Sequence, residues 1–485
     1  MQCLRLRFRG ILPRLVPIRY YAKKTDIPED VMEEMEEGFI NLCNSDSPSL
    51  LRKYLTRDLF DELKVKTTPT YKSNLLDCVR SGMYNFNSNV GIYAADPESY
   101  KTFAKLFDPI IEEYHGFKQG DKHPACCFGY GSDFPDLDPE RKFILSTRIR
   151  CARSLDGFPF NPMLTHCDYA QLQTTICRAF DRLCGEFSGK YFAVCNMKDK
   201  VKEKLIADHY MFREDDPFLE QGMAFRYWPL GRGIYMNRQK TFIVWVNEED
   251  HVRIISMEKG GDLGRVYERM IIGVESLAHE MKFAHDPHLG HLNFCPTNLG
   301  TSIRASVHIK LPSISSEATV VDVAQKYNLQ VRGTRGENSS PDNGIYDISN
   351  KRRMGVTEYQ IITEMYNGIK AIIETECQAA MDMERIMKAT AKDNMVLKGE
   401  EMQKIKRVDK CSPKKKPGDE KTDDKKGAAK KTEAKKAGDK KTVAKKAAAK
   451  AAATATAAKK VAAKKPQAKK GGDKKDKKGG AGKKK

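Results

Sequence analysis

Apolar residues recur at helical spacing in the first quarter of the chain. Val31, Met35 and Phe39 follow one another at intervals of four, and acidic residues cluster before them, where the positive end of a helix dipole favours negative charge. This pattern predicts a small all-helical domain over residues 25–120. A following stretch rich in Gly, Pro and Asp predicts a linker at residues 121–139.

Short apolar runs replace the helical pattern beyond residue 140. Runs such as TFIVWVN and ASVHIKL have the length and composition of strands. Amphipathic helices separate them, and the clearest of these includes Leu263, Val266 and Met270 at helical spacing. Several strands with helices packed against them predict an α+β domain over residues 140–395.

The net charge of the chain lies almost entirely at its C-terminal end. The whole chain carries +20, and the stretch from Lys410 to Lys485 holds 29 Lys against 8 acidic residues. The rest is therefore almost neutral and has no general reason to bind nucleic acid. Because such Lys- and Ala-rich sequence cannot bury enough apolar surface to fold, we predict a disordered tail over residues 396–485. A tail of this kind can bind an anionic membrane surface or an acidic polymer.

The N-terminal segment is basic in a different way. Residues 1–24 contain seven basic residues and no acidic one. They resemble a mitochondrial targeting segment, which predicts a mitochondrial protein. The alternative is a disordered basic terminus on a cytoplasmic protein.

Cysteine usage and hydropathy exclude two further classes of protein. The thirteen cysteines are scattered without a CxxC pair, which favours reduced thiols over a disulfide framework or a zinc module. No apolar run approaches the roughly 18 residues that cross a bilayer, so we do not expect a transmembrane protein.

Five motifs in a fixed order carry a resemblance to a known family. CPTNLGT, which begins at Cys295 and continues into SIRASVHIKLP, resembles the signature of the phosphagen (ATP:guanido) kinases. The other motifs, in the order of that family, are STRIRCARS, FRYWPLGRGIY, WVNEEDHVRIISM, and RGTRGE with IYDISNKRRMG. One motif alone can mislead, but five in order identify the chain as a member over roughly residues 28–395.

The resemblance implies a fold and an activity. The fold is α+β, with a small helical N-terminal domain and a larger domain whose antiparallel β-sheet is flanked by helices. The activity is reversible transfer of the γ-phosphoryl group of ATP, with Mg²⁺, to a guanidino nitrogen. Members of the family are monomers or homodimers.

Within the family the chain is most similar to the arginine kinases. The loop NSNVGIYA resembles their acceptor loop, and Tyr114 stands where creatine-specific members carry arginine. Asn89 departs from the glycine that arginine kinases commonly have. L-Arginine is therefore the expected acceptor, with taurocyamine or creatine as alternatives. A different class of function is binding of nucleic acid or another anionic polymer through the basic tail.

Phosphoryl transfer needs fixed cations, and arginine suits it because its planar fork donates two parallel hydrogen bonds. Arg148 and Arg150, two apart on an extended segment, would point to one face. Seen singly, each arginine would be a surface ion-pair partner. The resemblance assigns nucleotide binding to both and to Ser146, Thr147, His209, Arg253, Arg304, Ala305, Ser306, Val307, His308, Arg332, Gly333, Thr334, Arg335, Gly336 and Asp347.

The acceptor guanidinium must be oriented by negative groups. The resemblance assigns this role to Glu249 and Glu337, and places Cys295 beside them. We expect Cys295 to be a thiolate, because a hydrogen bond from Thr297 and the bound guanidinium would both lower its pKa. Without the motif, Glu249 would be a solvated turn residue and Cys295 a small buried hydrophobe.

Two smaller assignments complete the expected site. The carboxylate of the acceptor would bind the backbone N–H groups of Asn89, Val90 and Gly91 and the hydroxyl group of Tyr93. Magnesium would be held by phosphate oxygens and water without a direct protein ligand. Its outer-shell groups would be Glu248 and Asp250, which could equally be solvated surface acids.

Overall fold

The structure is a computed structural model that describes residues 27–314, 317–333 and 344–410. The chain divides into two units, residues 1–396 and 397–485, and the fold described below belongs to the first. The predicted targeting segment at residues 1–24 lies outside the described residues.

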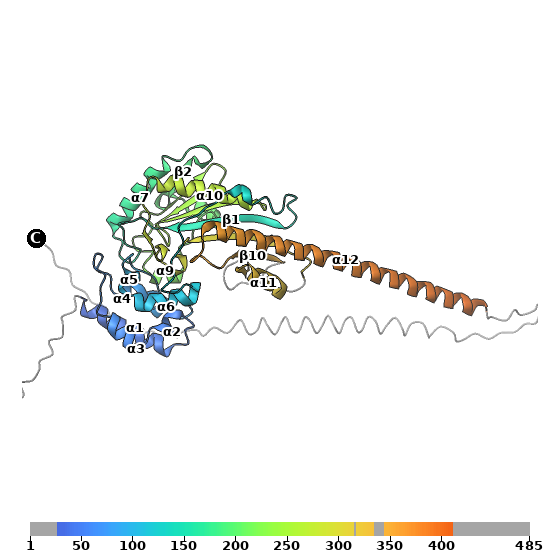
Figure 1. The fold of residues 1–485 in the computed structure, drawn as a ribbon, viewed down its shortest axis with the longest axis horizontal. Helices are drawn as coiled ribbons and strands as arrows, with labels where there is room; N and C mark the ends of the chain where they lie inside the picture. Colours follow the sequence, from blue (N-terminus) through green and yellow to red (C-terminus); the bar gives the residue numbers. More distant parts are fainter. Residues whose placement is uncertain (1–26, 315–316, 334–343, 411–485) are drawn as a thin grey trace, which may run out of the picture. The chain divides into compact units, whose positions relative to one another are not determined.

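A small helical domain comes first (Figure 1). Its helices are α1 (Glu29–Asn44), α2 (Leu50–Tyr54), α3 (Arg57–Leu63), α4 (Leu75–Tyr84), α5 (Ser99–Thr102) and α6 (Ala104–His115). Local sequence sets their ends: Asn74 and Asp77 form a capping box at the start of α4, and Gly116 adopts a left-handed conformation (φ 67°) after α6. The predicted small helical domain is confirmed.

The larger domain is built on an eight-stranded antiparallel sheet in the described residues. The strand order is β2-β3-β4-β5-β1-β8-β10-β9. The strands are β1 (Ile144–Arg153), β2 (Gly189–Ala193), β3 (Gly233–Asn237), β4 (Phe242–Val246), β5 (Val252–Lys259), β8 (Ile303–Lys310), β9 (Leu329–Arg332) and β10 (Ile345–Asn350). A separate hairpin pairs β6 (His285–Asp286) with β7 (Gly290–His291).

Helices flank this sheet. They are α7 (His166–Phe180), α8 (Asp199–Ala207), α9 (Pro217–Gln221), α10 (Leu263–Ala278), α11 (Glu317–Lys326) and α12 (Glu358–Lys410). Helices α10 and α8 lie on opposite faces of the sheet. Helix α10 packs on β1, β4 and β5. Its Val266 and Met270 share one core with Ile149 and Val307 of the sheet and Met365 of α12. The expected α+β class, an antiparallel sheet flanked by helices, is confirmed.

A second core joins the two domains. Phe103 and Phe107 of the helical domain are buried in one cluster with Phe294, Leu299 and Met354 of the larger domain. The contact is also polar, because the backbone N–H of Ala94 donates to the carbonyl oxygen of Phe294 at 2.7 Å. The segment that carries the signature motif therefore lies against both domains.

Helix α12 corrects one predicted boundary. It runs from Glu358 to Lys410, so residues 396–410 are helical and do not belong to a disordered tail. The error arose because Lys, Glu and Gln, which are common in disordered sequence, are also good helix formers. Side chains at residues 380–392 are exposed. The Lys-rich residues 411–485 lie outside the described residues.

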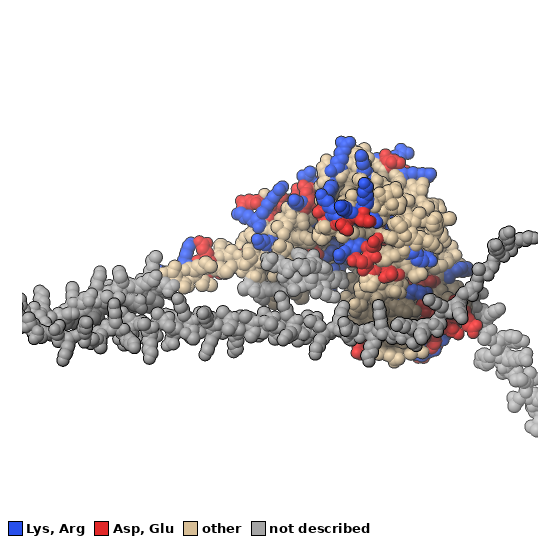
Figure 2. Space-filling view, turned by 180° about the vertical axis from the view of Figure 1, so that it is seen from behind, with Lys and Arg blue, Asp and Glu red and all other residues tan. Residues whose placement is uncertain are grey.

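The described surface has no large basic region on the face drawn in Figure 2, where Lys and Arg alternate with Asp and Glu. This fits the near neutrality of the chain before its tail. Cysteines in the described ranges are all free. Among the helices that the structure describes, none combines the length and the apolar character that crossing a membrane requires.

Candidate active site

A cleft of about 1100 Å³ opens on one face of the large sheet. Strands β1, β4 and β5 form its floor, and the segment from Ile206 to Leu219 forms a wall. The basic side chains that line it are the arginines Arg148, Arg150, Arg213 and Arg253 and the histidines His209 and His308.

The register of the sheet brings four of the predicted arginines to this face. Arg150 on β1 lies opposite Arg304 on β8, and Ala152 lies opposite Arg253 on β5. Opposed residues of antiparallel strands point to the same side, as do residues two apart on one strand. Three strands therefore present their arginines together: Arg148, Arg150, Arg253 and Arg304.

Asp347 on β10 extends the same face. It lies opposite His308 on β8 and opposite Arg332 on β9. One carboxylate oxygen accepts a hydrogen bond from Nη2 of Arg304 at 2.8 Å, and the other lies 3.8 Å from Nε2 of His308. The sequence-predicted nucleotide residues of β8, β9 and β10 thus meet at one end of the arginine face.

The charge at the centre of this face is not neutralised. Nε and Nη2 of Arg148 are buried and have no hydrogen-bond partner within the described residues. Burial, with the neighbouring Arg304 and Arg253, lowers the pKa of Arg148 to about 10. Burial and the same neighbours also hold the pKa of Arg150 well below its usual value. Cations that crowd together away from water create a strong site for an anion.

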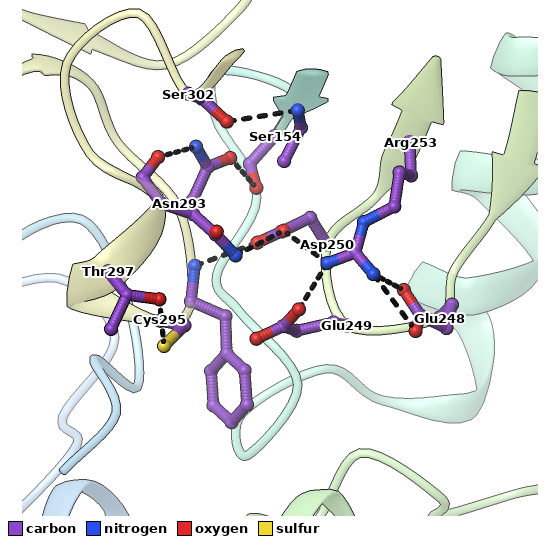
Figure 3. Close-up of polar contacts among 12 residues, drawn as sticks. Ser154, Glu248, Glu249, Asp250, Arg253, Asn293, Cys295, Thr297 and Ser302 are labelled. Atoms are coloured by element: carbon purple, nitrogen blue, oxygen red, sulfur yellow. Dashed lines mark hydrogen bonds and ion pairs between the residues drawn. The ribbon is translucent and has the colours of Figure 1, made fainter. Parts of the chain in front are cut away.

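A turn of three acids lies beside the arginines (Figure 3). Glu248, Glu249 and Asp250 connect β4 to β5, and all three approach the guanidinium of Arg253. Nη1 of Arg253 is 2.9 Å from Glu248, while Nη2 bonds Glu249 and is 3.6 Å from Asp250. Asn161 fixes the turn by donating to the carbonyl oxygen of Glu249 at 2.8 Å. Arg253 therefore links the arginine-lined cleft to Glu249, the residue predicted to bind the guanidinium of the acceptor.

Asp250 does not face the cleft, contrary to the outer-shell metal role expected for it. Its side chain is fully buried, and its carboxylate accepts hydrogen bonds from the N–H of Phe294 at 3.0 Å and from Nδ2 of Asn298 at 3.4 Å. It therefore anchors the signature segment to the acidic turn. Glu248 does line the cleft. The described residues contain no cluster of three or more His, Cys, Asp or Glu side chains that could hold a metal ion.

Cys295 lies at the start of a 3₁₀ turn, Pro296–Asn298, and its Sγ is 3.1 Å from Oγ1 of Thr297 in the expected hydrogen bond (Figure 3). The expected low pKa concerns the complex with a bound guanidinium, whereas in the structure itself the pKa of the thiol is raised. Burial raises the pKa of the thiol, and the negative charge of Glu249 raises it further, whereas Thr297 lowers it by less. The removal of the thiol from water outweighs one hydrogen bond, so Cys295 is protonated here.

The predicted acceptor loop reaches this site from the small domain. The ring of Tyr93 stacks on Phe294, next to Cys295, with centroids 4.3 Å apart. Burial raises the pKa of Tyr93, and the negative charge of Glu249 adds to the rise. The loop, the acidic turn and the signature segment therefore converge.

The backbone of this loop is held by α2. Carbonyl oxygens of Asn89 and Val90 accept hydrogen bonds from the N–H groups of Leu50 and Leu51. Gly91 has φ 80°, and a Cβ there would lie 2.9 Å from the Cβ of Leu51, so only glycine fits. Asn89 is not among the described residues with positive φ, so its replacement of the usual glycine causes no backbone strain.

Three of the predicted nucleotide residues turn their side chains away from the cleft. Ala305 and Val307 are part of the core under α10, and Thr147 donates to the carbonyl oxygen of Gly260 at 2.8 Å. Alternation along β1 and β8 requires this, because their neighbours on each strand face the cleft. Ser146 and Ser306 lie on the arginine face, and His209 lines the cleft. Gly333 is described, whereas Thr334, Arg335, Gly336 and Glu337 lie outside the described residues.

Two residues that sequence reasoning did not single out hold the signature segment in place. Nη1 of Arg353 donates to the carbonyl oxygen of Thr297 and to Oδ1 of Asn298, both at 2.6 Å. Nε2 of His115, at the end of α6, lies 2.9 Å from the carbonyl oxygen of Pro296. The sequence shows Arg353 only as part of a basic run, NKRR, and nothing in it marks the arginine as buried.

Together these features define a class of protein. A cleft with buried, unneutralised arginines suits a polyphosphate, and a neighbouring carboxylate bonded to a guanidinium suits a cationic acceptor. The site is therefore that of a phosphotransferase with a nitrogenous acceptor.

Comparison with known proteins identifies the family. A family model described as ATP:guanido phosphotransferase, C-terminal catalytic domain, matches residues 171–379, and the model of the N-terminal domain matches residues 45–112. Arginine kinase 1 of Drosophila melanogaster is 54% identical over 348 residues, which cover 71% of this chain and 98% of that protein. Arginine kinase Lit v 2.0101 of Penaeus vannamei is 54% identical over 349 residues, with the same coverage. The chain belongs to the ATP:guanido phosphotransferase family.

Solved structures of two kinases that act on guanidino compounds resemble this chain in fold and sequence. The duplicated taurocyamine kinase of Schistosoma mansoni with bound transition-state-analogue components has a TM-score of 0.67 and 39% identity. The match covers 70% of this chain and 48% of that one, so this chain spans about half the length of the duplicated enzyme. A lombricine kinase has a TM-score of 0.65 and 32% identity, over 71% of this chain and 94% of that one.

Proposed function

We propose that this protein reversibly transfers the γ-phosphoryl group of Mg-ATP to the guanidino nitrogen of L-arginine. The observation that carries the proposal is the position of Arg253. It lines the cleft that holds the unneutralised arginines, and it bonds Glu249 beside Cys295. One residue thus marks the boundary between the phosphate end and the acceptor end of a single site.

At the phosphate end, catalysis is mainly electrostatic. The transition state spreads negative charge over the transferred group, and fixed guanidinium groups stabilise it without reorganisation. Arg148 has guanidinium nitrogens without a partner in the described residues, Arg150 lies beside it on β1, and Asp347 orients Arg304. Magnesium, when bound, would neutralise further phosphate charge. Glu248 is the acid of the turn that faces the cleft and fits the role of holding a metal-bound water.

At the acceptor end, Glu249 is already in a guanidinium-binding geometry. Its carboxylate bonds the guanidinium of Arg253, which is the same chemical group that an arginine substrate presents. A second guanidinium beside it would share this carboxylate and would face the cleft that holds the γ-phosphoryl group. Holding a nucleophile in line in this way supplies roughly 7 to 11 kcal/mol of barrier lowering.

An assay of acceptors tests the proposal directly. The purified full chain is incubated with Mg-ATP and, in turn, L-arginine, taurocyamine and creatine, and ADP formation is followed together with ³¹P NMR of the phosphorylated product. We expect kcat/KM for arginine to exceed the other two by about 10²-fold. Preference for another guanidine would replace arginine in the proposal. Absence of acceptor-dependent ADP formation with every guanidine would overturn it.

Replacement of Cys295 tests its role. We propose that a bound guanidinium counteracts the effect of burial and converts the thiol to a thiolate that orients the acceptor. Cys295→Ala should therefore lower kcat by about 10²-fold and leave measurable activity. Initial rates measure the effect, and circular dichroism checks the fold. Complete loss of activity with an intact fold would indicate that Cys295 acts as a covalent nucleophile. An unchanged kcat would show that the thiol does not orient the acceptor.

Two further proposals rest on terminal residues outside the described ranges. We propose that residues 1–24 direct the protein to mitochondria, on the strength of their seven basic and no acidic residues. We also propose that the Lys-rich tail contacts an anionic membrane surface or an acidic polymer, because 28 of residues 411–485 are lysine. Binding of anionic polymers would then be an accessory property of an enzyme.

A further inference from the structure

The proposed acceptor would be held by residues of two domains. Its guanidinium would bind Glu249 on the acidic turn between β4 and β5, and its carboxylate would bind the acceptor loop of the small domain, which includes Gly91 and Tyr93. Both ends of the acceptor are charged, so each needs its partner when water is expelled from the site. The distance between the two anchors must therefore match the length of the acceptor.

Residues 159–161 are bonded to the small domain next to the acceptor loop. The backbone N–H of Phe160 donates to the carbonyl oxygen of Ala95 at 2.9 Å, two residues after Tyr93. The ring of Phe160 is buried in the core that the two domains share. Its carbonyl oxygen accepts from the N–H of Met163 at 3.0 Å, which closes the segment into a turn. The position of residues 159–161 is therefore fixed relative to the acceptor loop.

Asn161 connects the same segment to the acidic turn. Its Nδ2 donates to the carbonyl oxygens of Glu248 at 3.2 Å and Glu249 at 2.8 Å, and its Oδ1 accepts from the hydroxyl group of Tyr169 at 2.9 Å. The amide nitrogen thus faces two groups that only accept, and the amide oxygen faces a group that donates. Because Asn161 is buried, water does not replace a lost contact. The side chain therefore fixes the backbone that carries Glu249.

The acidic turn also holds the segment from its own side. Nδ1 of His251, the residue after the three acids, accepts from the N–H of Leu155 at 2.9 Å. Nε2 therefore carries the hydrogen, and it donates to the carbonyl oxygen of Pro159 at 3.0 Å. Burial lowers the pKa of His251 to about 4, so the ring is neutral at pH 7 and keeps both bonds. The turn and the segment are thus joined by two buried side chains, one from each.

We propose, on the basis of the function proposed above, that Asn161 is a positioning residue that sets the length of the guanidino acceptor. Asn161 does not line the cleft. It acts through Glu249, because it fixes the separation between that carboxylate and the acceptor loop bonded to Phe160. An acceptor that is one methylene longer or shorter would then have its guanidinium out of line with the γ-phosphoryl group when its carboxylate is bound.

Three acceptors that differ only in length test this role. They are L-arginine, L-homoarginine with one more methylene, and L-norarginine with one fewer, and kcat/KM for each is measured with Mg-ATP on the full chain. The unmodified protein should prefer arginine over each homologue by about 10- to 100-fold. Asn161→Asp keeps the shape of the side chain but has no N–H for the two carbonyl oxygens. It should lower this preference by at least about fivefold.

Tyr169→Phe changes the same contact more mildly. It removes the hydroxyl group that donates to Oδ1 of Asn161 and keeps the buried ring. We expect the preference for arginine to fall in the same direction, by about two- to threefold, because the amide of Asn161 loses one of its three partners. This variant still tests the role of Asn161 if Asn161→Asp misfolds.

Asn237→Asp is the matched control. Asn237 and Asn161 are both 3% exposed, and Nδ2 of Asn237 donates to the carbonyl oxygen of Glu186 at 2.9 Å. Asn237 lies at the end of β3 and does not line the cleft. The same chemical change there should lower the free energy of unfolding in urea by a similar amount and leave the preference for arginine unchanged.

The outcomes separate this role from the proposed function. Full retention of the length preference in Asn161→Asp and Tyr169→Phe, with an active unmodified protein, would overturn the role of Asn161 alone. An equal fall in Asn237→Asp would also overturn it, because lost stability would then explain the effect. Absence of turnover of all three acceptors by the unmodified protein would overturn the proposed function and the role of Asn161 together.

Discussion

Replacement of Arg253 by alanine is expected to abolish measurable turnover and to destabilise the fold. Kinetically, the loss removes a guanidinium from the phosphate face and takes away the ion-pair partner that orients the carboxylate of Glu249, so kcat should fall by about 10³-fold or more. Thermodynamically, it leaves Glu248, Glu249 and Asp250 together without their cation. Breaking a buried charge pair from one side costs about 3 to 5 kcal/mol.

The destabilisation should depend on pH in a defined direction. Burial raises the pKa of both Glu248 and Asp250, and Arg253 opposes the rise. Without Arg253 their folded-state pKa values move further above the unfolded values, so the folded variant prefers the protonated acids. Its stability is then greatest at low pH and is lost as pH rises through the folded-state pKa. Urea unfolding at pH 5 and pH 8 should show the larger deficit from the unmodified protein at pH 8.

Arg253→Lys is the matched control. Lysine keeps the charge between the three acids but lacks the planar fork that reaches Glu248 with one nitrogen and Glu249 with the other. We expect it to recover most of the stability and little of the activity. If Arg253→Ala kept kcat within a few-fold of the unmodified protein, the central position given to this residue would be wrong.

Much of the fold was predictable because it follows from local periodicity. Helical spacing around Met35 and Phe39 predicted the first domain, and the apolar runs around Val244 and Val307 predicted two strands, of which the first is wholly and the second mostly buried. The first compact unit ends at residue 396, within one residue of the predicted boundary, but the expected disorder of residues 396–410 was wrong because α12 continues to Lys410 through sequence with no stop signal such as proline. Strand order could not be deduced, because it depends on contacts between segments far apart in the chain.

The chemistry of the site was predictable where it depends on register and not where it depends on burial. Two arginines two residues apart on β1 had to share a face, and they do. Asp250 in NEED looked like Glu248, yet only the folded chain shows that it is buried against the signature segment. The protonated Cys295 has the same cause, since a sequence shows its hydrogen-bonding neighbour but not the water that folding removes.

The three neighbouring carboxylates of the acidic turn therefore have different roles. Asp250 ties the turn to the signature segment, Glu248 faces the cleft, and Glu249 bonds the boundary arginine from a less buried position. A side chain that is partly exposed and already paired with a guanidinium can exchange or share its partner without burying a new charge. Among the three, Glu249 is the one suited to bind a substrate.

Glu249→Gln is accordingly expected to lower kcat by about 10²- to 10³-fold and to raise KM for the guanidine, while KM for ATP changes little. Glutamine keeps the shape of the side chain but carries no charge and turns one acceptor into a donor, which a guanidinium cannot use. Arg253 retains Glu248 at 2.9 Å, so the fold should survive. Initial rates with each substrate varied separately measure these effects.

Glu258→Gln is the control for that experiment. It makes the same chemical change on β5, but Glu258 lies opposite Thr147, whose side chain points away from the cleft, and it pairs with Arg269 at 2.9 Å. Its kcat and both KM values should stay close to those of the unmodified protein. A Glu249→Gln enzyme that matched this control would show that the guanidine is held without Glu249, and the acceptor site would then have to lie elsewhere. An increase confined to KM for ATP would mean that Glu249 serves the nucleotide, because an acid that orients only the guanidine cannot weaken ATP binding alone.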